Sequence, residues 1–303
     1  MPVVLDAAQL NPGQLQEHTY QKSRIVDHTL DDADLETRCP LDNGKRPIQP
    51  RHNVGRLDKF PLEIVTEILL ALDLPTLTIF RRVNYRAMSL VDSIYQYRMI
   101  LKHCPNVLRA VVSINAGSFD CRVLYETLLT SKCATCDHFG GYLYLVTCKR
   151  VCYSCFTLNP NYFPVSWIFA ANQTGLKKQK ELKHHLPHVS SLRGRYTASN
   201  KLARHRSLLF DRQSVVEYVR HHPIHAHSEG SQELDDYMTT EPRRYMSIIS
   251  APYLSSSGQS ADWGYFCTRC KESTDPATFF RIKYTKEGIL EHIRWHGVTM
   301  TIL

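Results

Sequence analysis

The chain has 303 residues, of which 43% are hydrophobic, and it carries a formal net charge of +8. This length and composition are those of a globular protein with one or two hydrophobic cores. No apolar run reaches the roughly 20 residues of a membrane-spanning helix, and residues 1–10 lack the pattern of a secretory signal. We therefore expect no membrane partner and a location in the cytoplasm, the nucleus or both.

Residues 1–55 predict a disordered tail. They are mostly polar, with an acidic patch over residues 31–36 and three prolines between positions 40 and 50. A segment of this kind has few apolar side chains to bury, and its prolines interrupt regular structure.

Three or four short helices are predicted between Leu57 and Tyr97. Pro61 suits the first turn of a helix, and Asp73 can cap a second helix that begins near Pro75. The first helix has a wide apolar arc, which leaves Leu70 outside and consists of Leu62, Ile64, Val65, Ile68, Leu69, Ala71 and Leu72. In the second helix, the side chains expected to face inward are Leu77, Ile79 and Phe80. A helix on a small core needs an apolar stripe of only about 100°, so the surplus favours either a partner protein or a larger core.

The run from Phe60 to Leu90 resembles the F-box motif without a gap. Phe60 and Pro61 stand at its leading Leu-Pro pair, and Ala87 stands where many members have Trp. Its apolar positions are taken by Ile64, Ile68, Leu69, Leu72, Leu77, Val83 and Leu90. The resemblance implies an F-box helical bundle over residues 56–98.

F-box proteins dock on the Skp-type adaptor of cullin–RING ubiquitin ligases and present a substrate through the rest of the chain. The resemblance therefore implies a non-catalytic substrate receptor of an SCF-type ligase. Its partners would be the adaptor, a cullin reached through the adaptor, and an unidentified protein target for ubiquitination. The implied adaptor contacts are Phe60, Pro61, Leu62, Ile64, Ile68, Leu69, Leu77 and Val83.

Two C-x-x-C pairs form a module over residues 133–156. The pairs are separated by fifteen residues, and their members are Cys133, Cys136, Cys152 and Cys155. Two pairs at this separation predict one tetrahedral Zn²⁺ held by four thiolates, which leaves no position for a catalytic water. The site is therefore expected to be structural. The paired spacing also favours a metal protein of a reducing compartment over a disulfide-linked secreted protein.

A third cysteine of this module, Cys148, lies four residues before Cys152. The sequence leaves open whether it replaces a ligand or packs as a small hydrophobic residue. Residues 142–146 predict a strand that leads back toward the second pair. A RING domain needs eight ligands in two interleaved sites, and no Cys or His follows Cys155 at a suitable distance. We therefore do not expect the chain itself to recruit the charged ubiquitin carrier.

Positive charge is concentrated between Leu176 and Arg206, where nine Lys or Arg are opposed by one Glu. This window is a candidate surface for an acidic partner, nucleic acid or a nuclear import receptor, although such a stretch is more often a solvated loop or helix face. Tyr196 is the one Phe, Trp or Tyr among these cations, which argues against stacking on bases. A helix is predicted next, over residues 211–220.

A second metal module is predicted over residues 267–296. Its candidate ligands are Cys267, Cys270, His292 and His296. A helix from about Lys286 would place both imidazoles on one face, with Ile289 as a core residue, and residues 279–284 predict a strand. This arrangement resembles a C₂H₂ finger and predicts a second structural Zn²⁺. A solitary finger reads only about three base pairs, so we expect it to stabilise the end of the chain.

The order of these features resembles a group of fungal F-box proteins that carry a cysteine module after the box. The predicted fold is mainly α, with an F-box bundle followed by a zinc-binding α+β body over residues 99–303. The small β and irregular modules of this body are expected to be stabilised by zinc. The alternative function is a zinc-dependent nucleic-acid-binding protein that uses residues 176–206. The sequence contains no H-E-x-x-H motif or glycine-rich phosphate loop, which argues against an enzyme.

Overall fold

The protein is described here by a computed structural model, which covers residues 12–21, 27–41, 52–196, 202–222, 242–275 and 279–295. Within these residues, helices make up most of the regular structure. The strands pair in small antiparallel sheets of two or three strands. The predicted mainly α fold with small β modules is confirmed for this part of the chain. None of the helices described is both long and apolar enough to cross a membrane.

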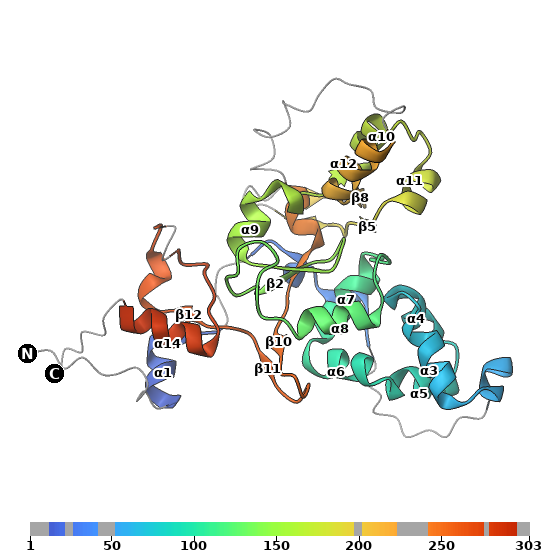
Figure 1. The fold of residues 1–303 in the computed structure, drawn as a ribbon, viewed down its shortest axis with the longest axis horizontal. Helices are drawn as coiled ribbons and strands as arrows, with labels where there is room; N and C mark the ends of the chain where they lie inside the picture. The colour runs from blue at the N-terminus through green and yellow to red at the C-terminus, as the bar shows by residue number, and fades with distance from the viewer. Residues whose placement is uncertain are drawn as a thin grey trace, which may run out of the picture.

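Consecutive helices from residue 55 to residue 128 form one end of the molecule (Figure 1). They are η3 (Gly55–Lys59), α3 (Leu62–Leu70), α4 (Leu74–Arg81), α5 (Tyr85–Ser93), α6 (Tyr95–His103), α7 (Pro105–Ser113) and α8 (Cys121–Leu128). Short polar side chains begin three of them, because Asp73, Asn84 and Asp120 each accept a hydrogen bond from a backbone N–H three residues later. The predicted cap at Asp73 is confirmed.

Helix α3 buries a different side from the one that its sequence predicts. Val65, Leu69 and Leu70 are buried, whereas Ile64 and Ile68 are 47% and 41% exposed. The prediction that Leu70 lies outside the apolar arc is wrong. Apolar residues occur almost all around this nine-residue helix, so its packing against the neighbouring helices decides which stripe is buried.

Helix α4 follows its predicted orientation only in part. Leu77 faces inward and is fully buried, and Phe80 is half-buried against the main core. Ile79, predicted to face inward, is 67% exposed. Its neighbours in α4 occupy the core-facing side, which leaves Ile79 toward solvent.

A three-stranded sheet lies in the middle of the main core. Its strands, in spatial order, are β3 (Lys149–Val151), β2 (Tyr142–Tyr144) and β9 (Ile248–Ser250), and the helical turns beside it are α9 (Tyr153–Leu158), η4 (Pro160–Tyr162) and η6 (Pro242–Ser247). The rings of Tyr142 and Phe156 lie 5.0 Å apart, and those of Tyr144 and Tyr162 lie 5.5 Å apart. The strand predicted over 142–146 is confirmed for residues 142–144.

Residues 165–222 form a second lobe with a hydrophobic cluster of its own, made by Val165, Ala170, Leu182, Leu186, Phe210 and Val215. Its elements are β4 (Val165–Ser166), α10 (Trp167–Thr174), α11 (Gln179–His185), β5 (His188–Ser190), β6 (Gly194–Arg195), β7 (Leu202–Ala203), β8 (Leu208–Phe210) and α12 (Arg212–His221). Strands β4, β8 and β5 form one sheet, and β6 pairs with β7. Helix α12 confirms the helix predicted over 211–220. Figure 1 shows α10, α11 and α12 together at the edge of the molecule.

Both ends of the described chain meet in a third region (Figure 1). Its elements are α1 (Pro12–His18), β1 (Thr19–Tyr20), β10 (Tyr253–Leu254), β11 (Ala261–Asp262), β12 (Phe266–Cys267), η7 (Arg269–Glu272) and α14 (Lys286–Trp295). Strand β1 pairs with β12, so that Thr19 lies opposite Cys267 and Tyr20 opposite Phe266. The helix predicted from Lys286 is confirmed.

The strand predicted over 279–284 is wrong. Of these residues, Tyr284 alone forms a bridge, with Tyr265, while the others form turns and irregular structure. Arg281 pairs with Asp27, and the ammonium group of Lys283 lies 5.6 Å from the ring centroid of Tyr142. These contacts bury two basic side chains that a half-exposed strand would place in solvent.

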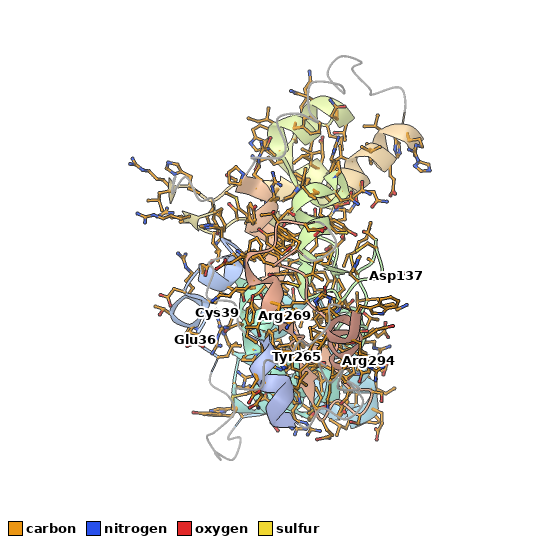
Figure 2. All side chains as sticks on the ribbon, turned by 90° about the vertical axis from the view of Figure 1, so that its left-hand side faces the viewer. Glu36, Cys39, Asp137, Tyr265, Arg269 and Arg294 are labelled. Carbon is orange, nitrogen blue, oxygen red and sulfur yellow. The ribbon has the colours of Figure 1, made fainter. Side chains whose placement is uncertain are left out.

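The described part of residues 1–55 is not a disordered tail. Helical turns form at η2 (Leu30–Asp32) and α2 (Leu35–Arg38), and their residues Leu30 and Leu35 are buried in the main hydrophobic core. Figure 2 shows Glu36 and Cys39 of this segment beside the body of the molecule. Residues 1–11, 22–26 and 42–51 lie outside the described part.

Acidic residues of this segment have partners far along the chain. The carboxylate of Asp27 pairs with Arg281 and accepts a hydrogen bond from the Tyr142 hydroxyl at 2.8 Å. The carboxylate of Asp31 accepts one from the backbone N–H of Ser250, also at 2.8 Å. The acidic composition that suggested a solvated tail therefore serves buried basic and polar groups, which the local sequence does not reveal.

Replacing Leu30 tests whether this segment belongs to the core. Leu30 is fully buried, so we expect Leu30→Ala to lower the free energy of unfolding by about 2–5 kcal/mol. Leu62→Ala is the control, because that side chain is 53% exposed and its loss should cost less than about 1 kcal/mol. Urea unfolding measures both variants, and equal small effects would place residues 27–41 outside the core.

Candidate metal centres and apolar docking face

The two C-x-x-C pairs of the first module converge on one site. The Sγ atoms of Cys133, Cys136, Cys152 and Cys155 all lie within 4.8 Å of one another. The hairpin of β2 and β3 brings the loop before β2 back to the start of α9, which carries the second pair. The sulfurs of Cys136 and Cys152 are 3.5 Å apart, near the roughly 3.8 Å edge of a tetrahedron with metal–sulfur bonds of about 2.3 Å. The four residues therefore fit a tetrahedral metal ion.

Thiol ionisation at this site shows what a cation would contribute. A hydrogen bond from the Cys152 thiol lowers the pKa of Cys133 to about 4, and that same bond raises the pKa of Cys152. Burial is the main cause that raises the pKa of Cys155 to about 12. One thiolate thus suppresses the ionisation of its neighbours, and four thiolates at these distances need a bound cation to balance their charge.

Two further residues near this site were not assigned from the sequence. The Nδ1 atom of His138 lies 3.3 Å from the Sγ atom of Cys136. In the tautomer with a proton on Nδ1, this ring can donate to the thiolate and stabilise its charge. Cys148 lies outside the ligand group, its thiol is 3.7 Å from the Thr127 hydroxyl, and burial raises its pKa to about 12. Cys148 therefore packs as a small hydrophobic residue.

The second site brings together three of its four predicted ligands. The ligand atoms of Cys267, Cys270 and His292 lie within 4.8 Å of one another, and the Cys270 sulfur is 3.3 Å from His292 Nε2. The ring of Tyr284 stacks on the His292 imidazole at 4.5 Å, which fixes the orientation of this ring. His296 lies outside the described residues, so its role as a ligand stays a prediction. Two sulfurs and an imidazole nitrogen are a donor set that suits zinc.

The N-terminal segment forms a wall of the second site, which the sequence did not predict. Leu15 of α1 packs in a small hydrophobic cluster with Cys267, Ile289 and Ile293. The backbone N–H of Thr268 donates a hydrogen bond to the carbonyl of His18 at 3.0 Å. A cluster this small supplies little folding energy, so a metal bound beside it would contribute much of the stability of this region.

Large apolar side chains are exposed on and around α3 and α4. We call them the apolar face, and they are Phe60, Leu62, Ile64, Ile68, Ile79 and Val83. Their exposed fractions run from 41% for Ile68 to 67% for Ile79. Ile64 and Ile68 lie one helical turn apart, as do Ile79 and Val83 around the end of α4. Pro61, next to Phe60, is exposed as well.

Three of the predicted adaptor contacts, Pro61, Leu69 and Leu77, do not belong to the apolar face. Leu69 and Leu77 are 2% and 0% exposed and belong to the main hydrophobic core. These two residues hold α3 and α4 against the other helices, and their contact with an adaptor stays a prediction. Ala87 is also fully buried, so the small residue at this position is part of the internal packing.

The basic window remains a candidate surface in the structure. All of its described Lys and Arg side chains, from Lys177 to Arg206, are exposed. Most of them lie on the second lobe, in α11 and in the loops around β6 and β7. Lys201 lies outside the described residues.

Comparison with known proteins gives this chain no relatives. No family model, no curated protein and no solved structure matches it. The function of the chain is therefore inferred from the geometry of its sites and from the resemblance carried by residues 60–90.

Proposed function

We propose that residues 56–98 dock on a Skp-type adaptor and that the chain is the substrate receptor of an SCF-type cullin–RING ubiquitin ligase. The observation that carries this proposal is the apolar face on α3 and α4. Five of its residues, Phe60, Leu62, Ile64, Ile68 and Val83, stand at positions where the F-box resemblance implies adaptor contacts, and Ile79 is the sixth exposed residue.

The size of this face supports a protein partner. Single exposed apolar residues are ordinary on protein surfaces, but here six large ones fall between residues 60 and 83. Each gains about 1.5–3 kcal/mol when it moves from full exposure to full burial. The six are about half exposed, so covering them is worth several kcal/mol before the cost of association. Exposed apolar side chains gathered on consecutive helices favour a protein-binding site.

The rest of the chain would select the target. In this proposal the body over residues 99–303 holds an unidentified protein, and two structural zinc ions stabilise the modules at Cys133–Cys155 and Cys267–His292. The chain then performs no bond chemistry, and it acts by raising the concentration of the target near the catalytic subunits of the ligase. The cullin is reached through the adaptor, in the cytoplasm or the nucleus.

Charge placed on the apolar face tests the proposal. We expect Ile64→Asp combined with Ile68→Asp to weaken binding of a purified Skp-type adaptor at least 100-fold, because two carboxylates would be buried without partners. Isothermal titration calorimetry measures the affinity. Both side chains are exposed, so the circular dichroism spectrum and the thermal midpoint should change little.

The matched control carries the same change elsewhere. Ile168 and Val216 are 57% and 49% exposed on α10 and α12 of the second lobe. Ile168→Asp combined with Val216→Asp should leave adaptor binding unchanged. Undiminished binding by the double variant at residues 64 and 68, or no binding by the unmodified chain, would reject the proposal.

A further inference from the structure

Four aromatic rings form a row between the last turns of α11 and α12. We call it the ring row, and its members in spatial order are His184, His185, Tyr218 and His222. The centroid distances between successive rings are 5.0, 5.6 and 4.2 Å. The three histidines are exposed and Tyr218 is half-buried. Tyr218 and His222 are stacked, His185 is tilted against Tyr218, and His184 meets His185 edge to face. The row is therefore an accessible cluster of rings and not part of a core.

Backbone contacts hold part of the row in place. The Nδ1 atom of His222 lies 3.0 Å from the carbonyl oxygen of Tyr218, and that of His221 lies 2.7 Å from the carbonyl oxygen of Glu217. These contacts restrain the imidazoles at the end of α12. Tyr218 packs against the hydrophobic cluster of the lobe, which restrains the middle of the row.

Basic side chains lie on the same two helices as the ring row. Lys180 and Lys183 are exposed on α11, and Arg220 is exposed in the last turn of α12. The described residues between 165 and 222 carry ten Lys or Arg against three Asp or Glu, a formal net charge of +7. Of the three acids Asp211 is buried, so exposed negative charge on this lobe comes from Glu181 and Glu217.

Stabilisation of the helices accounts for Lys183 and Arg220, which lie in the last turns of α11 and α12, but not for the cations at the start of α11. Basic residues favour the C-terminal end of a helix and are unfavourable at its N-terminal end. Lys177 and Lys178 precede α11 directly, and Lys180 lies in its first turn. One ion pair offsets them, between Lys178 and Glu181 at 3.5 Å. Helix stability therefore does not explain the excess of positive charge at the N-terminal end of α11, which indicates a role in binding.

The sequence of residues 176–206 offers few aromatic rings for stacking on bases, but the structure brings in a ring from another segment. Within residues 176–206, Tyr196 is the one Phe, Trp or Tyr among the cations, and it is buried. Tyr218 lies outside this window, yet its ring is 5.6 Å from that of His185 because α10 packs against both α11 and α12. The ring of Tyr218 therefore lies beside α11, the helix that carries Lys180 and Lys183, although it is distant from that helix in the sequence.

We propose that the ring row and the cations on its two helices bind single-stranded nucleic acid. Unpaired bases would stack on the rings, and Lys180, Lys183 and Arg220 would contact phosphates, which is the arrangement of stacking platforms in basic grooves. An acidic protein would use the cations but would gain nothing from a row of rings. A duplex would keep its bases inside. The geometry therefore favours unpaired nucleic acid, and this inference is independent of the proposed adaptor binding.

Fluorescence anisotropy with the full chain tests this inference. The probes are labelled single strands of oligo-dT and oligo-U, each about 20 nucleotides long, and their unlabelled duplexes serve as competitors. We expect binding at about 50 mM salt that weakens steeply toward about 200 mM. The duplexes should compete poorly. Absence of binding to either strand at about 50 mM salt would overturn the proposal.

The charge variants locate the contact. Lys180→Gln, Lys183→Gln and Arg220→Gln together should reduce the slope of log affinity against log salt by about 2, from roughly 0.7 per lost phosphate contact. The control removes three exposed lysines outside the lobe: Lys102→Gln, Lys132→Gln and Lys286→Gln. It should keep the original slope. An equal decrease of this slope in both triple variants would show that overall charge causes the effect, and it would reject the site.

The ring variants separate nucleic acid from an acidic protein. Tyr218→Phe keeps the ring and should bind as the unmodified chain does, whereas Tyr218→Leu should bind about tenfold more weakly. Far-ultraviolet circular dichroism checks that both variants stay folded. If Tyr218→Leu binds with full affinity and poly-L-glutamate displaces the probe as well as unlabelled oligo-dT does, the surface is an acidic-protein site and the inference is wrong.

Discussion

Replacement of Cys133 by Ser is expected to remove one bound metal ion per chain and to unfold the module over residues 133–156. The Cys133 sulfur is one of four that lie within 4.8 Å of one another, and no other described thiol is placed to substitute for it. Structural zinc contributes apparent binding free energies of about 10–16 kcal/mol in small zinc modules. That figure is comparable to the whole stability of a typical domain, about 5–15 kcal/mol.

The effect should extend beyond the module itself. Cys133, Cys152 and Phe156 belong to the main hydrophobic core, together with β2. We therefore expect the thermal midpoint of the whole chain to fall after Cys133→Ser. Plasma mass spectrometry measures the ratio of metal to protein, and it also identifies the metal. Removal of metal from the unmodified chain by a strong chelator should reproduce the same loss of stability.

Cys148→Ala is the matched control for this substitution. Cys148 is a buried cysteine of the same module, but its thiol contacts Thr127 and is not one of the four ligands. It should keep the full metal content and lose only about 1 kcal/mol of stability, as small core changes do. Full metal content in the Cys133→Ser variant, or a lost ion in the Cys148→Ala variant, would contradict the assignment of ligands.

Local sequence signals predicted the parts of the fold that local chemistry determines. The cysteine spacing predicted the first metal site because each C-x-x-C pair forms its own turn. Asp73 predicted the start of α4, and the spacing from Lys286 predicted α14 with Ile289 buried and His292 beside the cysteines. Each of these features depends on residues that are close in the sequence.

Long-range contacts explain what the sequence did not predict. Residues 27–41 looked like a solvated tail because their partners, among them Arg281 and Ser250, lie more than 200 residues away. Leu70 turned inward because neighbouring helices selected the buried stripe of α3. The rings of Tyr218 and His185 lie close together because α11 and α12 both pack against α10. In every case a contact between distant segments, which one sequence alone does not show, decided which side chain was buried.

Arg150→Met is expected to lower the free energy of unfolding by about 3–5 kcal/mol, as the loss of a buried charge with its hydrogen bonds typically does. Arg150 is 2% exposed, and burial lowers its pKa to about 10, so it stays charged at neutral pH. Its guanidinium donates hydrogen bonds to the backbone carbonyls of Thr127, Leu128, Gly140, Ala251 and Pro252. Among the described residues no carboxylate forms an ion pair with it.

These five carbonyls belong to three separate segments: the end of α8, the loop after the first cysteine pair, and the chain that follows β9. A methionine fills a similar volume but donates nothing, so buried carbonyls would lose partners at about 1–3 kcal/mol each. Arg150→Lys should recover little of the lost free energy of unfolding, because a single ammonium group cannot reach all three segments at once. Urea unfolding measures each variant with metal present.

The neighbouring residue supplies the control for Arg150. Lys149 is half-buried on β3, and its ammonium group donates to the Gln213 side chain at 3.1 Å. Lys149→Met should therefore cost less than about 1 kcal/mol, and an equal effect at both positions would show that the carbonyl contacts of Arg150 add nothing to stability. Because Gly140 lies in the loop that carries Cys133 and Cys136, Arg150→Met should also make the first metal ion easier to remove by a chelator. Lys149→Met should leave that rate of removal unchanged.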